Sequence, residues 1–174
     1  MPEIMFRLAT PTDVPAIMDI MTKAHRAMPD PSAYITDDEP YIAAHIQGES
    51  FVLLAEADGV TAGFFLVCVP GLAENNLGHY LNFSENQLRQ VAMMDSAAVL
   101  PEFQGLGIMG HMFTLAVART APNYPYLLGT VSPDNFPSRR NFEKCGFSIL
   151  KIVEKPGGLK RLLMGRGSGL EGSQ

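Results

Sequence analysis

Two spacings of hydrophobic residues divide the chain into predicted helices and strands. The clearest helical spacing lies in "TPTDVPAIMDIMTKAHRAM", where one face holds Val14, Ile17, Met18 and Met21. Thr10 or Thr12 is a suitable cap for this helix, and Pro15 falls in its first turn, where proline is tolerated. A second helix is predicted over about 38–47. Two more are predicted over about 108–119 and within "PDNFPSRRNFEKCG", which ends in a glycine.

Strand-like runs separate these helices. The clearest is a hairpin in "SFVLLAEADGVTAGFFLVCV", where two β-rich runs flank Asp58-Gly59, a pair favoured in tight turns. A buried strand is predicted over 91–99, although Asp95 interrupts its apolar run. Shorter strands are predicted at 5–8, 126–131, 147–153 and 157–164. The resulting order, β-α-α-β-β-β-α-β-α-β-β, indicates one mixed α/β sheet and not an alternating doubly wound one.

Two segments have no clear periodicity. Residues 72–90 combine turn formers with mixed polarity, which fits a loop, a partial helix or a lid, and loops of this length are often functional. The tail after residue 165 is small and polar, so 166–174 is predicted to be disordered. With 174 residues and no repeat or linker, the chain is predicted to form a single domain over 1–165.

Composition narrows the functional classes. The formal net charge of −5 argues against a nucleic-acid partner. Cys68 and Cys145 are too few for a disulfide framework or a metal cluster, so we expect two reduced, buried thiols in a cytoplasmic protein that binds no metal. The N-terminus lacks the pattern of a signal peptide, and no apolar run reaches the length of a membrane span.

The stretch "FQGLGIMGHM" raises the question of a phosphate-binding loop. Gly105, Gly107 and Gly110 match G-x-G-x-x-G, the dinucleotide fingerprint. That fingerprint requires glycines directly after a strand and an acidic residue about twenty positions later. Here Pro101 intervenes, and no Asp or Glu occurs between Glu102 and Asp134. A nucleoside-triphosphate loop is excluded as well, because histidine and methionine follow Gly110 where Lys-Ser/Thr is required. A structural turn before a core helix remains an alternative.

A third interpretation accounts for more of this stretch. "VLPEFQGLGIMGHM" resembles the acyl-CoA loop of the GNAT superfamily of N-acetyltransferases, in which a strand ending V-x-P leads to R/Q-x-x-G-x-G/A. Val99, Pro101, Gln104 and Gly107 match, while Met109 occupies the last Gly/Ala position. There is also a physical reason, independent of the family, for such a loop to bind a pyrophosphate. A glycine-rich turn at a helix N-terminus presents unpaired N–H groups and partial positive charge to it.

Three other stretches carry the same resemblance. "FRLATPTDVPAIMDIM" resembles the opening R-x-A-x-x-x-D-x-x-x-I of the family, and "EKPGGLKRLLM" resembles an ending found in a subset of it. "TVSPDNFPSRRNFEKCGF" resembles the last conserved helix. The matching positions there are Asn135, Ser138, Phe142, Glu143, Lys144, Gly146 and Phe147.

The resemblance implies a fold, a co-substrate and a set of binding residues. The implied fold is a single mixed, mostly antiparallel sheet with a central splayed parallel pair of strands, flanked by helices. Acetyl-CoA would bind where the strands over 91–99 and 126–131 separate. The residues implied in binding it are Ala98, Val99, Gln104, Gly105, Leu106, Gly107, Ile108, Gly110, Asn135, Ser138 and Phe142.

The implied reaction is direct attack of an amine on the thioester. A backbone N–H near Val99 would stabilise the oxyanion. Asp95 is the candidate base, because burial in the strand would raise its pKa; alternatively, it only hydrogen-bonds a neighbouring loop. The family often uses a tyrosine in the last helix to protonate the thiolate, but here that position is Phe142. Ser138, Tyr124 and Tyr126 are the available substitutes, and unassisted departure of the thiolate is the other route.

Three functional hypotheses follow. The first is an acetyl-CoA-dependent N-acetyltransferase acting on a small-molecule or peptide amine, with His79, Tyr80 and Glu85 as candidate substrate contacts and a homodimer as its implied assembly. The second is a non-catalytic acetyl-CoA-binding module, because Phe142 lacks a hydroxyl. The third is a nucleotide-dependent oxidoreductase, against which the missing ribose carboxylate argues.

Overall fold

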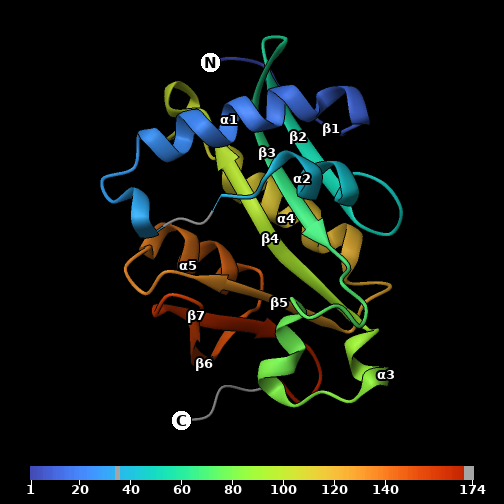
Figure 1. Cartoon of the computed structure of the whole chain (residues 1–174). Coiled ribbons are helices and arrows are strands. Elements are labelled where there is room, and N and C mark those ends of the chain that lie inside the picture. The colour runs from blue at the N-terminus through green and yellow to red at the C-terminus, as the bar shows by residue number, and fades with distance from the viewer. Residues whose placement is uncertain (34–35, 171–174) are drawn as a thin grey trace. The chain divides into compact units, whose positions relative to one another are not determined.

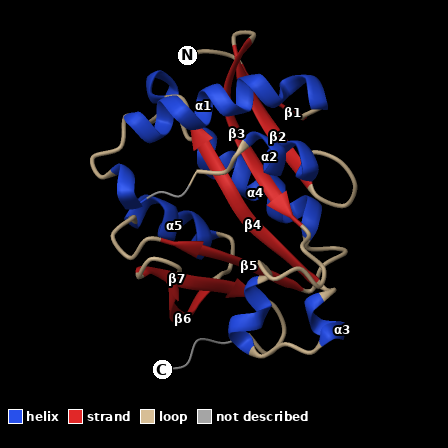
Figure 2. Ribbon diagram, viewed as in Figure 1, coloured by secondary structure: helices blue, strands red, loops and turns tan. Residues whose placement is uncertain are grey.

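The computed structural model describes residues 1–33 and 36–170. Hydrogen bonding links seven strands in the order β1-β2-β3-β4-β5-β7-β6, and helices flank the strands (Figures 1 and 2). The β4–β5 pair is parallel, and the β1–β2, β2–β3, β5–β7 and β7–β6 pairs are antiparallel. The sheet is therefore mixed and mostly antiparallel, as the sequence predicted.

The chain forms two compact units that interleave along the sequence. Unit one consists of Met1–Cys68 and Asp95–Ala116, and unit two of Val69–Met94 and Val117–Gln174. Strand β4 (Val91–Val99) and helix α4 (Ile108–Thr120) each contribute residues to both units. The prediction of a single domain over 1–165 stays a prediction. The tail prediction for 171–174 lies outside the described residues, and strand β7 extends to Arg166, the first residue of the predicted tail.

In unit one, strands β1 (Ile4–Leu8), β2 (Phe51–Ala57) and β3 (Val60–Cys68) are successive antiparallel neighbours. The turn between β2 and β3 confirms the predicted hairpin: Asp58 and Gly59 have φ angles of 49° and 80°. Positive φ at both central residues defines a type I′ turn, whose twist matches that of the flanking strands.

Helices cover both faces of these strands. Helices α1 (Val14–Arg26) and α2 (Glu39–His45) contact β3 and each other. Helix α4 lies behind the strands in Figure 2. Its Phe113 packs edge-on against Phe65 of β3, with ring centroids 5.2 Å apart. Gly63 allows this close packing, because a Cβ there would lie 3.2 Å from the Met112 side chain.

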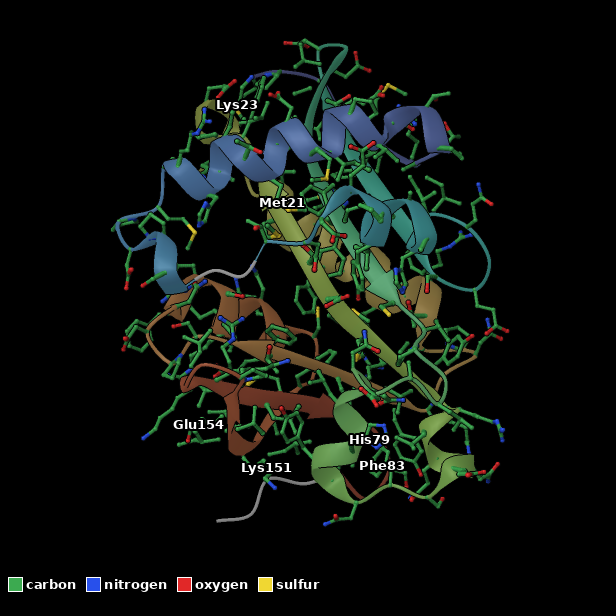
Figure 3. The ribbon with its side chains drawn as sticks, in the orientation of Figure 1. Met21, Lys23, His79, Phe83, Lys151 and Glu154 are labelled. Carbon is green, nitrogen blue, oxygen red and sulfur yellow. The ribbon has the colours of Figure 1, made fainter. Side chains whose placement is uncertain are left out.

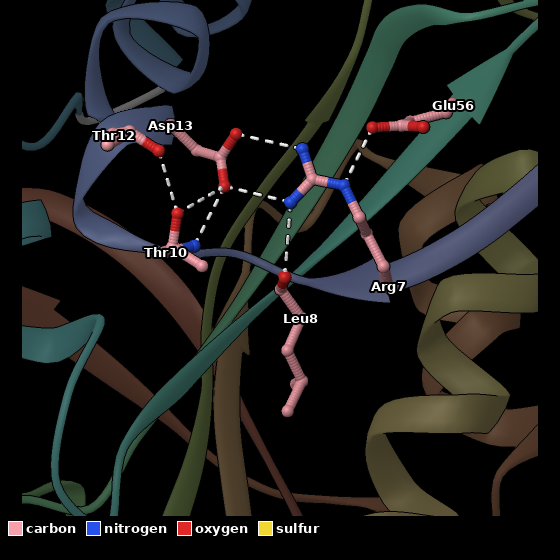
Figure 4. A network of polar contacts seen from close by, with 6 residues as sticks. All are labelled: Arg7, Leu8, Thr10, Thr12, Asp13 and Glu56. Carbon is pink, nitrogen blue, oxygen red and sulfur yellow. Dashed lines mark hydrogen bonds and ion pairs between the residues drawn. The ribbon is translucent and has the colours of Figure 1, made fainter.

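A polar network fixes the start of α1 in unit one (Figure 4). Arg7 forms two hydrogen bonds to the Asp13 carboxylate, at 2.8 and 2.9 Å, and one to Glu56 at 2.7 Å. The Thr10 N–H donates to Asp13 at 2.7 Å. The Arg7 guanidinium, more than any other group, lowers the pKa of Asp13 to about 2. The motif that resembled the family's opening therefore ties β1 to α1.

We predict that Asp13→Asn lowers the free energy of unfolding by about 1 kcal/mol at pH 7, allowing for solvent screening of this partly exposed pair. Because the folded-state pKa is below the ordinary value of 3.8, this contribution is present above pH 4 and is lost as the pH falls toward 2. Urea unfolding at pH 7 and at pH 3 measures it. Asp19→Asn, which breaks only an exposed pair with Lys23, is the matched control. Equal losses in both variants at pH 7 would contradict the prediction.

Unit two contains β5 (Tyr126–Val131), β7 (Leu159–Arg166) and β6 (Ser148–Lys155), together with the first part of β4. The parallel ladder pairs Val91↔Tyr126 through Met94↔Gly129, and both strands continue beyond it. Helix α5 (Phe136–Lys144) follows β5. Its Phe142 ring occupies the space over Gly129, where a Cβ would approach within 2.6 Å of the ring.

The unassigned segment 72–90 also lies in unit two. It forms a 3-10 helix, η3 (Leu77–Leu81), and one short helix, α3 (Glu85–Leu88). Buried Asn76 connects the two, because its side-chain amide donates to the carbonyls of Gly71 and Leu88 at 2.8 and 3.0 Å. The partial-helix alternative is therefore correct. Of the two thiols predicted to be buried, Cys68 is buried and Cys145 is only half-buried, and both are free.

Candidate functional site

The glycine-rich loop of unit one joins the end of β4 to the start of α4. A short 3-10 turn, η4 (Pro101–Phe103), follows the strand, and the Gln104 side chain donates to the Val99 carbonyl at 3.3 Å. Gly105 and Gly107 have φ angles of 83° and 78°, in the left-handed region that favours glycine. A Cβ at either glycine would meet no atom within 4 Å, so the loop backbone is open on that side.

The backbone N–H groups of this loop are available as donors. The first helical bond of α4 runs from the His111 N–H to the Gly107 carbonyl at 3.1 Å. Within the described part of the chain, no hydrogen bond uses the amides of residues 105–110. The N-terminus of a thirteen-residue helix adds partial positive charge at the same place. This arrangement can hold an anion such as a diphosphate.

The strand residues before the loop are more enclosed. Ala98 and Val99 are each 6% exposed, and the Leu100 N–H donates to the Ala62 carbonyl of β3 at 2.7 Å. These contacts hold the end of β4 in place ahead of the loop. The roles predicted for Ala98 in binding and for the Val99 N–H as an oxyanion donor stay predictions.

Asp95 lies on β4 but is not buried, and this corrects an expectation from the sequence. Its neighbours Met94 and Ser96 are buried, whereas the Asp95 side chain is exposed. A carboxylate is costly to remove from water, so an apolar strand can carry one only where its side chain reaches solvent or a donor. The donor here is the Tyr41 hydroxyl on α2, which hydrogen-bonds Oδ2 of Asp95.

Tyr41 is held from several sides. Asp38 caps α2 and accepts from the Tyr41 N–H at 2.9 Å. One turn later, His45 Nδ1–H donates to the Tyr41 carbonyl at 2.7 Å, and the two rings lie 4.1 Å apart. Burial and the charge of Asp95 raise the pKa of Tyr41. The hydroxyl therefore stays protonated and remains a donor to the carboxylate.

A second carboxylate, Asp37, lies near Asp95 in unit one. It is half-buried, and burial together with the negative charge of Asp95 raises its pKa to about 6, while the Ser96 hydroxyl acts in the opposite direction. The charge of Asp95 also acts on Cys68. Burial has the larger effect and the charge of Asp95 the second largest, and together they raise the pKa of the Cys68 thiol to about 11. With a pKa of about 6, the carboxyl group of Asp37 can exchange protons near neutral pH.

Sequence reasoning missed both Asp37 and Tyr41. The run "TDDEPY" read only as the start of a helix, and Asp38 is indeed its cap. One available signal was charge: no Lys or Arg occurs between Arg26 and Arg89. The carboxylates in that stretch therefore have no nearby cation along the chain to pair with.

We predict that Asp37→Asn makes the protein more stable at pH 7.5, by on the order of 1 kcal/mol once solvent screening of this partly exposed carboxylate is allowed for. The folded-state pKa of Asp37 is raised above its ordinary 3.8, so ionising it costs the folded state stability as the pH rises from about 4 to 6. Asparagine removes that cost. Urea unfolding should show the two proteins equally stable near pH 4 and separated at pH 7.5. A variant that is less stable at pH 7.5 would contradict this prediction.

In unit two, the residues predicted from the last helix have structural partners. The Asn135 side chain caps α5 and accepts from the Ser138 N–H at 3.2 Å. Phe142 is buried and packs edge-on against Phe147 at 5.1 Å. Of the tyrosines proposed as substitutes for it, Tyr126 packs against Phe83 with ring centroids 4.9 Å apart and the ring planes tilted by 52°. Roles for these residues toward CoA stay predictions.

The three candidate substrate contacts also lie in unit two. Figure 3 labels one of them, His79. His79 Nε2 lies 3.1 Å from the Ala73 carbonyl, and the Tyr80 carbonyl accepts from Lys151 Nζ at 3.0 Å. Glu85 is exposed at the first position of α3. Local contacts thus explain the placement of His79 and Tyr80, and substrate roles for all three stay predictions.

The described residues contain neither a cluster suited to a metal ion nor a helix suited to span a membrane. No group of three or more His, Cys, Asp or Glu side chains within 1–33 and 36–170 is arranged to hold a metal ion. In the same ranges, every helix is too short or too polar to cross a membrane.

Several solved structures have a fold similar to that of this chain. The ribosomal-protein-alanine N-acetyltransferase of Brucella melitensis superposes with a TM-score of 0.72 at 18% identity, covering 93% of this chain and 98% of that one. The protein yncA of Salmonella typhimurium, solved with its cofactor acetyl-CoA, gives 0.70 at 18% identity, with 98% and 96% covered. The ribosomal-protein-S18-alanine N-acetyltransferase of Escherichia coli gives 0.63 at 19% identity, with 99% and 98% covered. At these identities the likeness establishes the fold alone.

The sequence itself establishes the family. A search of curated protein sequences found no match. The model of the acetyltransferase (GNAT) family, however, matches residues 14–147, which include β4, the glycine-rich loop and α5. Because this match covers well over half of the chain, the protein belongs to the GNAT acetyltransferase family.

Proposed function

We propose that the protein transfers an acetyl group from acetyl-CoA to a primary amine of a small molecule or peptide. The observation that carries the proposal is the loop at the end of β4, where the amides of residues 105–110 donate no hydrogen bond within the described chain and a Cβ at Gly105 or Gly107 would meet no atom within 4 Å. A diphosphate fits such donors at a helix N-terminus. In the proposed complex, the loop holds the diphosphate of CoA, and the pantetheine arm follows the backbone at Ala98 and Val99.

The proposed chemistry is direct transfer within a ternary complex. The carboxylate of Asp95 accepts a proton from the acceptor ammonium, and the freed nitrogen electron pair forms a bond to the thioester carbon. The Val99 N–H stabilises the resulting oxyanion. The C–S bond then breaks, and CoA leaves as a thiolate. The nitrogen, now bonded to the acetyl carbon, gives up its second proton through water to that thiolate, which leaves the neutral amide and the CoA thiol.

Charge supports an acceptor that arrives as a cation. Unit one carries twelve Asp and Glu side chains against three Lys and Arg. Such an excess attracts an ammonium group toward Asp95 and Asp37 before the reaction begins.

A second candidate function is a non-catalytic acetyl-CoA-binding module. It is favoured by Phe142, which stands where the family often places a tyrosine and which is buried against Gly129. The other sequence predictions stay predictions: a cytoplasmic location, a homodimer, and no nucleic-acid partner.

Calorimetric titration with acetyl-CoA, followed by a thiol-release assay over a panel of amines, tests both candidates. The panel includes simple monoamines, a diamine and a peptide beginning with alanine, the last because two similar structures are alanine N-acetyltransferases. Release of CoA with at least one amine supports the transferase. Binding without release for every amine supports the binding module. If acetyl-CoA does not bind, both are wrong.

A further inference from the structure

A side-chain hydrogen bond links helix α2 to strand β4 in unit one. The Tyr41 hydroxyl, on the first turn of α2, donates to Oδ2 of Asp95 on β4. The Asp95 side chain is exposed, so water alone could satisfy its charge. The proposed reaction assigns no task to Tyr41. Neither the solvation of Asp95 nor the transfer step itself therefore explains why Tyr41 lies against this carboxylate.

The Tyr41 hydroxyl is a fixed donor, because helix α2 holds the rest of the residue. The Tyr41 N–H donates to the Asp38 carboxylate at 2.9 Å, and its carbonyl accepts from His45 Nδ1–H at 2.7 Å. The Tyr41 and His45 rings lie 4.1 Å apart. A tyrosine side chain has only two χ angles, so a ring held in this way leaves its hydroxyl little freedom. The position of the donor is therefore set by α2 itself.

A fixed donor limits the orientations that Asp95 can adopt. An exposed carboxylate without a fixed partner changes among its rotamers within nanoseconds, and only some of these direct an oxygen toward an incoming amine. A base is effective only when its oxygen lies within hydrogen-bond reach of the proton that it takes. The bond from Tyr41 to Oδ2 favours one rotamer of Asp95, so the carboxylate spends more of its time in a single orientation.

Tyr41 also stabilises the charged form of Asp95, because a hydroxyl that donates to a carboxylate favours the ionised state. From the segment before α2, Asp37 faces Asp95, and its negative charge acts in the opposite direction. From β3, Cys68 faces both Asp95 and Tyr41, but its thiol has a pKa of about 11 and stays neutral at pH 7. Burial and the charge of Asp95 raise the pKa of Tyr41, so the hydroxyl keeps its proton.

We propose that Tyr41 is a positioning residue for amine acetylation, holding the Asp95 carboxylate in one orientation and in its charged form until it takes a proton from the acceptor. The inference rests on the proposed function, because that proton is the one given up by the acceptor amine. The ammonium N–H bond breaks, its proton passes to the Asp95 carboxylate, and its electron pair stays on nitrogen for attack on the thioester. Tyr41 keeps its own proton throughout and acts only through Asp95.

The first experiment measures the effect of the hydrogen bond without turnover. The carboxyl carbon of Asp95 is titrated by NMR in the wild-type protein and in Tyr41→Phe, which removes the hydroxyl and keeps the ring against His45. We expect the Asp95 midpoint to rise by roughly half a pH unit or more in Tyr41→Phe, because the charged carboxylate loses a donor. An unchanged or lowered midpoint would overturn the inference.

Ile42→Val is the matched control for a purely structural effect. Ile42 is fully buried and follows Tyr41 on α2, so its truncation loosens the packing of the helix and leaves the hydroxyl in place. The variant should unfold at a lower urea concentration than the wild type, yet its Asp95 midpoint should stay at the wild-type value. A rise as large as that of Tyr41→Phe would mean that packing of the helix controls Asp95, which contradicts the inference.

The second experiment measures kcat and KM across pH for an amine that the protein acetylates. Tyr41→Phe should lower kcat about tenfold, because Asp95 is no longer held in one orientation, while the acetyl-CoA affinity stays unchanged. The acidic limb of its kcat/KM profile should move to higher pH, in step with the Asp95 midpoint. Ile42→Val should change neither kcat nor the limb. An unchanged kcat in Tyr41→Phe, or a limb that stays at the wild-type pH, would refute the role of Tyr41.

The two experiments separate this inference from the proposed function. If no amine is acetylated but the Asp95 midpoint rises in Tyr41→Phe, the transferase proposal fails and the control of Asp95 by Tyr41 stands. If acetylation occurs but neither the midpoint nor the acidic limb moves, the role of Tyr41 fails and the transferase proposal stands.

Discussion

Replacing Gly107 with valine is expected to weaken acetyl-CoA binding at least tenfold, a loss of about 1.4 kcal/mol or more in binding free energy. Gly107 has a φ of 78°, and a β-branched residue is strongly disfavoured in that left-handed conformation. Its Cβ would meet no atom within 4 Å, so the effect does not come from a clash inside the protein. The loop instead relaxes to a negative φ and turns the amides around Gly107 away from the diphosphate. Isothermal titration of both proteins with acetyl-CoA measures the loss.

Gly48 offers a matched control for this variant. It has a φ of 79°, an equally open environment and a place in the same unit, but it lies in the turn between α2 and β2. Gly48→Val therefore imposes the same backbone strain away from the loop, and it should bind acetyl-CoA like the wild type. If Gly107→Val also binds like the wild type, or if both variants lose affinity equally, the loop does not hold the diphosphate.

Features that depend on a few consecutive residues could be predicted from the sequence. The Asp58-Gly59 pair predicted a hairpin because only a few residue types tolerate two positive φ angles in succession, and the structure confirms it. The spacing of Gln104 and Gly107 after Pro101 predicted a glycine loop at a helix start in the same way. Local backbone chemistry determines both features, so no knowledge of distant contacts was needed.

Features that depend on residues far apart in sequence were missed or wrong. Asp95 was expected to be buried because its neighbours are apolar, but its side chain is exposed and accepts a hydrogen bond from Tyr41, 54 residues earlier in the chain. Asp37 was overlooked because a helix cap explained the acidic run around it. In segment 72–90, the interior contacts of Asn76 decided between a loop and two short helices. No local pattern marks such a residue as buried.

Replacing Asp95 with asparagine is expected to lower kcat/KM by about a hundredfold or more at pH 7.5, with acetyl-CoA affinity unchanged. Asparagine keeps the size of the side chain and an oxygen that can accept from Tyr41, but it takes up no proton near neutral pH. Ammonium cannot attack the thioester, so the reaction then depends on the small fraction of amine that is already neutral. Steady-state thiol release with an accepted amine gives kcat and KM, and calorimetry gives the acetyl-CoA affinity.

Asp58→Asn is the control for Asp95→Asn, because it removes one exposed negative charge from the same unit and asparagine suits the turn at that position. The control should keep wild-type kcat and KM. A raised KM with unchanged kcat in Asp95→Asn would show that the carboxylate only attracts the ammonium. Raising the assay pH should restore much of the activity of Asp95→Asn, because the amine then loses its proton to solvent, whereas a misfolded variant would not recover. Failure to recover at high pH would therefore contradict a role for Asp95 in proton transfer.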